Sequence, residues 1–276
     1  MPNAQQQPPV VLTIAGFDPS AGAGIAADIK TFAAHGCYGI ACITALTVQS
    51  TQGVRAVHAV DAQIIRDTLA ELGSDFDIAA VKIGMLANAP VVNAIADFLE
   101  RAKPRVSVVD PVLTSSSGAT LLDDAGLRVF VDRLLPLAYV ITPNSHEAAL
   151  LTGLEVLDLP GAERAAGRLH ELGACNVVVT GGHLAEPCTV VSMHDRSRGP
   201  RRIPFERVES SATHGTGCAF SSALAANLAR NIALLPAVEA AQTYVSEALR
   251  NAPHLGHGKG PMQHLWRIRQ ESQRRL

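Results

Sequence analysis

The sequence predicts an α/β protein in which a mostly parallel central sheet is covered by helices on both faces. Three observations support this prediction. Short apolar runs of strand length alternate with longer segments of helical periodicity along most of the chain. Most of these runs end at glycine or polar residues, as strands of a parallel sheet do where they enter crossover connections. A chain of 276 residues, 47% of them hydrophobic, is also long enough to bury one large core.

The predicted elements follow one another in a regular order. Strands are expected at residues 10–14, 40–47, 79–83, 106–109, 139–141 and 176–179. Helices are expected at residues 25–34, 62–72, 89–101, 121–134, 145–151 and 162–172. A hairpin of residues 189–193 and 202–208, joined by a Ser-Arg-Gly-Pro turn, is expected next. Two alanine-rich helices at residues 216–230 and 236–250, and a glycine-rich segment at residues 256–260, complete the pattern.

The chain ends and the composition indicate a single-domain protein and argue against several other classes of protein. We expect a polar, disordered tail at residues 1–8, followed by a single domain at residues 9–276. A net charge of −2 without a basic run argues against nucleic-acid binding. The sequence has neither an apolar run of the ~18 residues that a membrane span needs nor the pattern of a signal peptide, which predicts a cytoplasmic protein. Five scattered cysteines predict neither disulfides nor a zinc site.

A glycine-rich loop at residues 213–217 precedes the first alanine-rich helix. Gly215, Thr216 and Gly217 place several free backbone N–H groups at the start of this helix, where the helix dipole also favours negative charge. The loop therefore predicts an anion-binding pocket. Cys218 follows in the first helical turn, where the same field is expected to lower the pKa of its thiol.

Polar residues and glycines also follow the predicted strands, at the edge of the sheet where ligands of such folds bind. They include residues 15–24, Asp28, Gln49, Met85, Asp110, Asn144, Glu147, Gly181 and Gly182. Asp110 could bind magnesium directly or through water, and Asn144 and Glu147 offer two further oxygens. Ordinary structural roles remain open at this point. Asn144 and Glu147 fit a helix-capping box, Asp18 and Asp28 fit a turn and a first helical turn, and His214 fits a structural hydrogen bond.

Eight short motifs, in order along residues 9–265, resemble those of the hydroxymethylpyrimidine/phosphomethylpyrimidine kinases of thiamine biosynthesis, within the ribokinase-like superfamily. They are Asp18-Pro19-Ser20 with Gly22 and Gly24, Lys30-Thr31-Phe32, Ile43-Thr44-Ala45-Leu46, Lys82-Ile83-Gly84-Met85-Leu86, Asp110-Pro111-Val112, Thr142-Pro143-Asn144 with Glu147, Gly181-Gly182-His183 and His214-Gly215-Thr216-Gly217-Cys218. The resemblance implies a ribokinase-like three-layer αβα sandwich that uses ATP and Mg²⁺ and forms a cytoplasmic homo-oligomer, with a dimer favoured. It also implies two successive phosphoryl transfers, to 4-amino-5-hydroxymethyl-2-methylpyrimidine and then to its monophosphate.

The resemblance assigns roles to individual positions. Substrate-binding positions are Gly16, Asp28, Val48, Gln49 and Met85. Metal-side positions are Asp110 and Glu147, and nucleotide-side positions are Asn144, Thr180, Gly181, Gly182 and Gly217. The catalytic positions are Gly215, Thr216, Gly217 and Cys218, where the backbone N–H groups would stabilise the transferring phosphoryl group and the Cys218 thiol would act as base.

Two departures from the family pattern keep alternatives open. Ser116 and Thr180 stand where the family commonly has lysines, so the charge of a nucleotide or monophosphate must be met by an arginine or by Lys259. The second phosphorylation depends most on this compensation. The alternatives are a pyridoxal or pyridoxine kinase of the same superfamily and a pyrimidine-binding protein without catalysis.

Overall fold

The apolar runs of the sequence form the centre of one sheet in a computed structural model of the protein, which describes residues 7–115, 118–182, 184–195 and 199–268. The strands are β1 (Val10–Phe17), β2 (Tyr38–Ser50), β3 (Gly53–Ala59), β4 (Ile78–Ile83), β5 (Ser107–Val109), β6 (Val140–Ile141), β7 (Asn176–Val179), β8 (Cys188–Ser192) and β9 (Arg201–Pro204). Their spatial order is β3-β2-β1-β4-β5-β6-β7-β8-β9.

The helices connect the strands and flank the sheet. They are α1 (Gly24–Ala34), α2 (Ala62–Asp75), α3 (Ala89–Ala102), α4 (Asp124–Val129), the π-helical turn η1 (Phe130–Leu134), the short 3₁₀ turn η2 (Leu135–Leu137), α5 (Ser145–Thr152), α6 (Leu159–Glu171), α7 (Thr216–Ala229) and α8 (Leu234–Arg250). None of the helices in the described ranges combines the length and apolar composition that crossing a bilayer requires.

Parallel pairing of the central strands explains why the polar residues after them gather at one edge. Strands β2, β1, β4, β5, β6 and β7 pair in parallel, so their carboxyl ends point the same way. The antiparallel strands β3, β8 and β9 lie outside this central group. The sheet therefore presents one long edge at which loops from six parallel strands meet.

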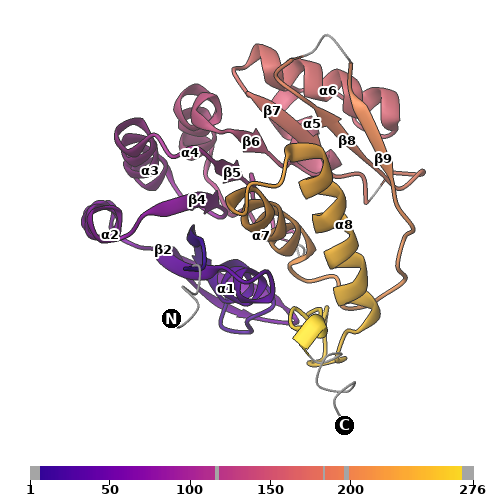
Figure 1. Cartoon of the computed structure of the whole chain (residues 1–276), viewed down its shortest axis with the longest axis horizontal. Helices are drawn as coiled ribbons and strands as arrows, with labels where there is room; N and C mark the ends of the chain where they lie inside the picture. The colour runs from indigo at the N-terminus through magenta and orange to yellow at the C-terminus, as the bar shows by residue number, and fades with distance from the viewer. Residues whose placement is uncertain (1–6, 116–117, 183, 196–198, 269–276) are drawn as a thin grey trace, which may run out of the picture.

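Helices cover both faces of the sheet, as expected from strands that are buried on both sides. One core cluster joins the sheet to α2, α3, α5 and α6, and a second joins it to α1, α7 and α8. Figure 1 shows α2, α3 and α4 on one side of the sheet and α1, α7 and α8 on the other. The predicted three-layer α/β architecture is thus confirmed.

Several predicted boundaries were wrong. β2 continues to Ser50 because it pairs with β3, a strand that the sequence analysis missed, and β1 continues to Phe17 through a register shift after Ala15. The helix expected at residues 121–134 begins only at Asp124, because Asp123 caps it, and it ends in a π turn and a 3₁₀ turn. The second strand of the predicted hairpin is shorter than expected, because β9 ends at Pro204. Part of the predicted turn and residues 1–6 of the predicted tail lie outside the described residues.

The glycine-rich segment at residues 256–260 packs against the turn between β2 and β3. The backbone N–H of Gly258 donates to Thr51 Oγ1 over 3.2 Å, and a Cβ atom at Gly258 would lie 2.1 Å from the Thr51 carbonyl oxygen. The next residues reach the glycine-rich loop, because the His214 N–H donates to the Gly260 carbonyl over 3.3 Å. This segment therefore links the β2–β3 turn to the loop before α7.

Candidate active site

Helix α7 begins at the glycine-rich loop without a side-chain cap. Its N-cap residue, Gly215, has a left-handed backbone conformation with φ of 79°, and a Cβ atom there would lie 2.0 Å from the Gly22 carbonyl oxygen. Only glycine fits this conformation and this close approach. The N–H groups of the first helical turn are therefore available to an anion.

Cys218 lies where the starts of two helices meet. The backbone N–H of Gly24, the first residue of α1, donates to the Cys218 thiol, and α1 also lacks a side-chain cap. Nevertheless, the prediction of a lowered thiol pKa was wrong. Burial raises the pKa of Cys218 to about 12, and the nearby carboxylates of Asp110 and Asp28 act in the same direction, outweighing the opposite effect of Lys82.

Asp110, directly after β5, faces the first turns of α7. A Cβ atom at Gly217 would lie 4.0 Å from Asp110 Oδ2, and Ser221 Oγ donates to the same oxygen over 2.9 Å. Burial raises the pKa of Asp110. The carboxylate is thus held beside the backbone N–H groups of residues 215–218.

Glu147 approaches Asp110 from the start of α5. Glu147 and Asn144 form the expected capping box, with hydrogen bonds of 2.9 Å in each direction. Burial, and then the charge of Asp110, raise the pKa of Glu147 to about 8. The capping role and the predicted metal-side role of Glu147 are therefore compatible, because the same carboxylate caps α5 and lies close to Asp110.

The Asp110 and Glu147 pair fits magnesium as a ligand set. The charge of Asp110 opposes the ionisation of Glu147, a divalent cation would favour the ionised form of both, and carboxylate oxygens are the ligands that Mg²⁺ prefers. Across the described ranges, no group of three or more His, Cys, Asp or Glu side chains could hold a metal ion. Remaining ligands would have to come from water and phosphate oxygens, which is the usual arrangement for magnesium in kinases.

The acceptor positions Gly16 and Met85 lie side by side. A Cβ atom at Gly16 would lie 2.8 Å from Met85 Sδ, and Met85 belongs to a small apolar cluster with Ala45 and Leu121. Val48 projects from β2 with 50% of its surface exposed. These residues offer an apolar surface to a flat ring.

Gln49 supplies a polar group beside that surface. Its Nε2 lies 3.1 Å from Nε2 of His214, which in turn lies 2.7 Å from Asp18 Oδ2. Asp18 also accepts hydrogen bonds from the backbone of Ser20 and Ala23, so it organises the loop before α1. His214 thus has the structural hydrogen-bonding role that the sequence left open for it, and Asp18 has a turn role.

Asp28 does not have the predicted role in substrate contact. Its carboxylate is fully buried, and its two oxygens accept hydrogen bonds from Thr13, Lys82 and Ser222. A ligand cannot reach a carboxylate that is enclosed in this way. The sequence analysis placed Asp28 correctly in a helix. Its hydrogen-bond partners lie between 15 and 194 residues away along the chain, so no local sequence pattern could show that its carboxylate is enclosed.

The nucleotide-side positions follow β6 and β7. Thr180 pairs with Asn144 in a short bridge and donates its N–H to the Pro143 carbonyl over 2.9 Å. Gly181 is buried, and a Cβ atom there would lie 1.9 Å from the Cys188 carbonyl oxygen. Gly182 is exposed, whereas His183 lies outside the described residues. Glycine at position 181 is therefore required by the close approach of β8.

Comparison with known proteins identifies the family. A family model described as phosphomethylpyrimidine kinase matches residues 18–263. The hydroxymethylpyrimidine/phosphomethylpyrimidine kinase of Rhizobium meliloti is 43% identical over 94% of this chain and 97% of its own length. The chain belongs to the phosphomethylpyrimidine kinase family. The thiamine biosynthesis bifunctional protein ThiED of Geobacter sulfurreducens is 44% identical over 92% of this chain, which spans 52% of that longer protein.

Solved structures of this family and its neighbours share the ribokinase-like fold. The phosphomethylpyrimidine kinase of Clostridium difficile aligns over 87% of this chain and 99% of its own, with a TM-score of 0.77 and 36% identity. A pyridoxal kinase of Bacillus subtilis in complex with ADP aligns over 95% of this chain and 100% of its own, with a TM-score of 0.85 and 31% identity. The predicted ribokinase-like αβα sandwich is therefore confirmed.

Two basic side chains lie close to the predicted nucleotide and acceptor residues. Arg207 Nη2 donates to the carbonyl oxygens of Gly182 and Leu184, over 3.2 Å and 2.6 Å, on the nucleotide side. Lys259 lines a cavity of about 220 Å³ together with Gln49 and His214, on the acceptor side. Of the two positions that lack the lysine of the family pattern, Thr180 forms the bridge with Asn144, and Ser116 falls outside the described residues.

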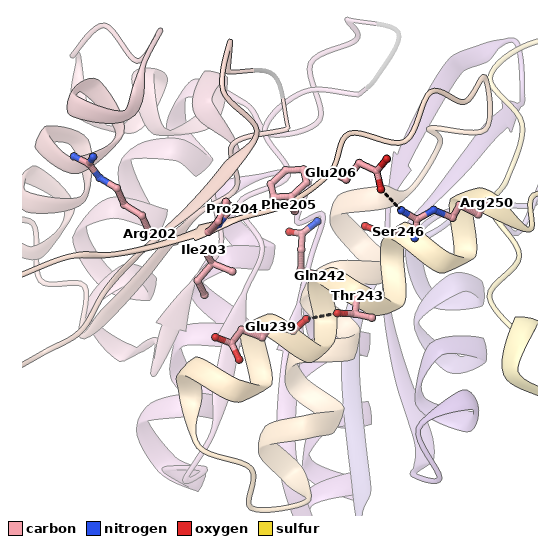
Figure 2. Close-up of a pocket in the computed structure, with 10 residues that line it drawn as sticks. All are labelled: Arg202, Ile203, Pro204, Phe205, Glu206, Glu239, Gln242, Thr243, Ser246 and Arg250. Carbon is pink, nitrogen blue, oxygen red and sulfur yellow. Dashed lines mark hydrogen bonds and ion pairs between the residues drawn. The ribbon is translucent and has the colours of Figure 1, made fainter.

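A groove of about 450 Å³ between β9 and α8 contains none of the predicted site residues. Figure 2 shows Phe205 and Gln242 on its two walls and the ion pair between Arg250 and Glu206, whose charged atoms are 2.8 Å apart, at one end. The predicted residues that the structure does bring together lie around Cys218 and Asp110 instead.

Proposed function

We propose that this protein transfers the γ-phosphoryl group of ATP to the hydroxymethyl group of 4-amino-5-hydroxymethyl-2-methylpyrimidine and then phosphorylates the monophosphate. One observation carries the proposal: the uncapped starts of α1 and α7 meet at Cys218, opposite the Asp110 and Glu147 carboxylates. Exposed N–H groups on one side and metal-binding acids on the other are what a transferring phosphoryl group requires.

In this proposal, backbone groups do most of the stabilisation. The N–H groups of residues 215–218 donate to the oxygens of the transferring phosphoryl group, where negative charge spreads during the reaction. Cys218 lies at the same point and accepts the proton of the acceptor alcohol when it is ionised. Asp110 and Glu147 would hold a magnesium ion, which when bound would supply positive charge to the phosphate oxygens.

The acceptor would lie against Gly16, Val48 and Met85, with its polar ring edge toward Gln49. An aminopyrimidine edge needs both hydrogen-bond donors and acceptors, and the amide of Gln49 offers both. We assign a second group of residues to the nucleotide, namely Asn144, Thr180, Gly181 and Gly182. Thr180 follows β7 directly and forms a bridge with Asn144.

Sequence similarity favours the pyrimidine over pyridoxal as acceptor. The kinase of Haemophilus influenzae, 41% identical over 92% of this chain, is named as a hydroxymethylpyrimidine/phosphomethylpyrimidine kinase, whereas the pyridoxal kinase of Bacillus subtilis is 31% identical. The presence of Asp110 and Glu147 also argues against a non-catalytic pyrimidine-binding protein, because such a protein has no need of magnesium ligands. A cytoplasmic location and a homodimer remain predictions from the sequence.

An ADP-release assay tests the proposal. The purified protein is incubated with MgATP and, in turn, with the hydroxymethylpyrimidine, its monophosphate and pyridoxal. We expect turnover of both pyrimidines and much slower turnover of pyridoxal. Turnover of the alcohol alone would restrict the protein to the first transfer and show that Arg207 and Lys259 do not replace the missing lysines. Absence of turnover with either pyrimidine would refute the proposal.

A further inference from the structure

Lys82, in β4, is fully buried directly beneath the candidate active site. Its Nζ lies 3.1 Å from each carboxylate oxygen of Asp28, and both side chains have no exposed surface. Burial alone would lower the pKa of Lys82, but the charges of Asp28, Cys218 and Asp110 and the hydrogen bonds to Asp28 together raise it above its usual range, so Lys82 carries a positive charge. No ligand can reach the ammonium group of Lys82, which excludes direct contact with a substrate.

The Lys82–Asp28 ion pair ties four elements together. Thr13 Oγ1 of β1 and Ser222 Oγ of α7 each donate to Asp28, both over 2.6 Å. Asp28 belongs to α1 and Lys82 to β4, so strands and helices meet at one carboxylate. The preceding residue, Ser221, donates to Asp110. Two consecutive serines thus fix the first turns of α7 to two buried acids.

Within the ion pair, the Lys82 ammonium group acts more strongly on the glycine-rich loop than the Asp28 carboxylate does, because it lowers the pKa of Cys218 more than Asp28 raises it. Cys218 and Asp110 both lie within electrostatic reach of the Lys82 ammonium group. A buried ion pair seldom adds net stability compared with apolar residues of the same volume, because removing both charges from water is costly. Stability therefore does not account for an ionised pair at this position, whereas a reaction that gathers negative charge nearby does.

We propose that Lys82 is a positioning residue for phosphoryl transfer: paired with Asp28, it holds the start of α7 in place through Ser222 and keeps a permanent positive charge behind residues 215–218. This inference rests on the proposed function, since it assigns Lys82 to the same reaction. It requires that loss of the ion pair slow the transfer step and leave acceptor binding nearly intact.

The test compares a charge-free variant with the wild type. In Lys82→Met/Asp28→Asn, the asparagine can still hydrogen-bond Thr13 and Ser222, so the fold should survive while the charges disappear. We expect kcat to fall about 10²-fold, with the acceptor KM within about threefold of wild type. Circular dichroism and thermal melting establish that the variant is folded. A folded variant with wild-type kcat would overturn the inference.

Two further variants sharpen the comparison. Arg133→Met/Asp97→Asn removes an ion pair of 2.9 Å between η1 and α3, on the other face of the sheet, and should leave kcat unchanged. Ser222→Ala keeps the Lys82–Asp28 pair but removes its link to α7, and we expect kcat to fall about tenfold, the scale of one lost hydrogen bond. If the charge-free variant does not fold, wild-type kcat in Ser222→Ala would still overturn the inference.

A binding measurement separates this inference from the proposed acceptor. MgADP with aluminium fluoride imitates the transferring phosphoryl group and needs no particular acceptor. We expect it to raise the melting temperature of the wild type and to raise that of the charge-free variant much less. If the wild type turns over neither pyrimidine but shows this difference, the acceptor assignment fails and the role of Lys82 stands. Equal stabilisation of both proteins would refute that role.

Discussion

At the scale of single residues, Cys218 is subject to two opposing influences. The Lys82 ammonium group and the backbone N–H of Gly24 at the start of α1 favour its thiolate form, whereas burial and the carboxylates of Asp110 and Asp28 oppose it. The second influence is larger, and the thiol pKa rises to about 12. Cys218 therefore becomes a better proton acceptor as the pH rises, and its contribution can be measured from the pH dependence of the rate.

We expect Cys218→Ala to lower kcat about 10²-fold at neutral pH, on the usual scale for a general base. The wild-type rate should increase between about pH 7 and pH 9, because the thiolate fraction grows as the pH approaches the raised pKa. The rate of the variant should not show this increase. Steady-state assays across this pH range provide the measurement. Parallel pH profiles for the two proteins would show that the thiol does not take the proton.

At the scale of elements, the start of α7 depends on a glycine that cannot be replaced. Gly215 has a left-handed backbone conformation and approaches the Gly22 carbonyl, which ties the loop before α7 to the loop before α1. Gly217, two residues later, is exposed, and its nearest neighbour would lie 4.0 Å from an added Cβ atom. The two glycines therefore form a matched pair for substitution.

We expect Gly215→Ala to destabilise the protein by about 1 to 3 kcal/mol, because alanine at this φ is strained and its Cβ atom would collide with a backbone oxygen. Gly217→Ala should leave the unfolding free energy within about 0.5 kcal/mol of wild type, and it serves as the control. Denaturant unfolding measures both values. Equal destabilisation by the two substitutions would contradict the argument from backbone conformation.

Local sequence patterns were sufficient to place most elements and the polar residues that follow the strands. The apolar runs predicted all six strands that pair in parallel in the described ranges, and the Gly-Thr-Gly motif predicted the start of α7. The limits appear where distant segments meet. β3 was missed because Gly53–Ala59 lacks a strong apolar alternation and depends on its pairing with β2. Lys82 and Asp28 were not recognised as partners, since 54 residues separate them in the sequence.

At the scale of the whole molecule, the segment after α8 is held against α1 and α8 by buried aromatic and histidine side chains. The ring of His35 packs against Tyr244 with 4.6 Å between centroids, and the Tyr244 hydroxyl donates to the His264 carbonyl over 2.8 Å. Both histidines are buried, and within the described chain their Nε2 atoms have no hydrogen-bond partner. Burial lowers the pKa of His35 to about 4 and that of His264 to about 3.

Stability should therefore fall in mild acid. Each lowered pKa contributes stability above about pH 6.5, where both folded and unfolded histidines are neutral, and this contribution is lost as the pH falls toward 4. We expect a loss of up to about 1.4 kcal/mol per pH unit for each histidine. His35→Phe should reduce the slope, whereas substitution of the exposed His58 by asparagine should not. Urea unfolding between pH 7 and pH 4 measures the slopes, and equal slopes in all three proteins would exclude this cause.

The paired serines of α7 have a consequence for protein design. Ser221 and Ser222 project from α7 about 100° apart and contact two different carboxylates, which fixes both the rotation of α7 and its position along its axis. The two serines lie one turn inside the helix, so their hydrogen bonds leave the uncapped first turn available to an anion. A transplant of residues 213–218 onto another scaffold would therefore bind an anion poorly unless the two serines and their buried acids moved with it.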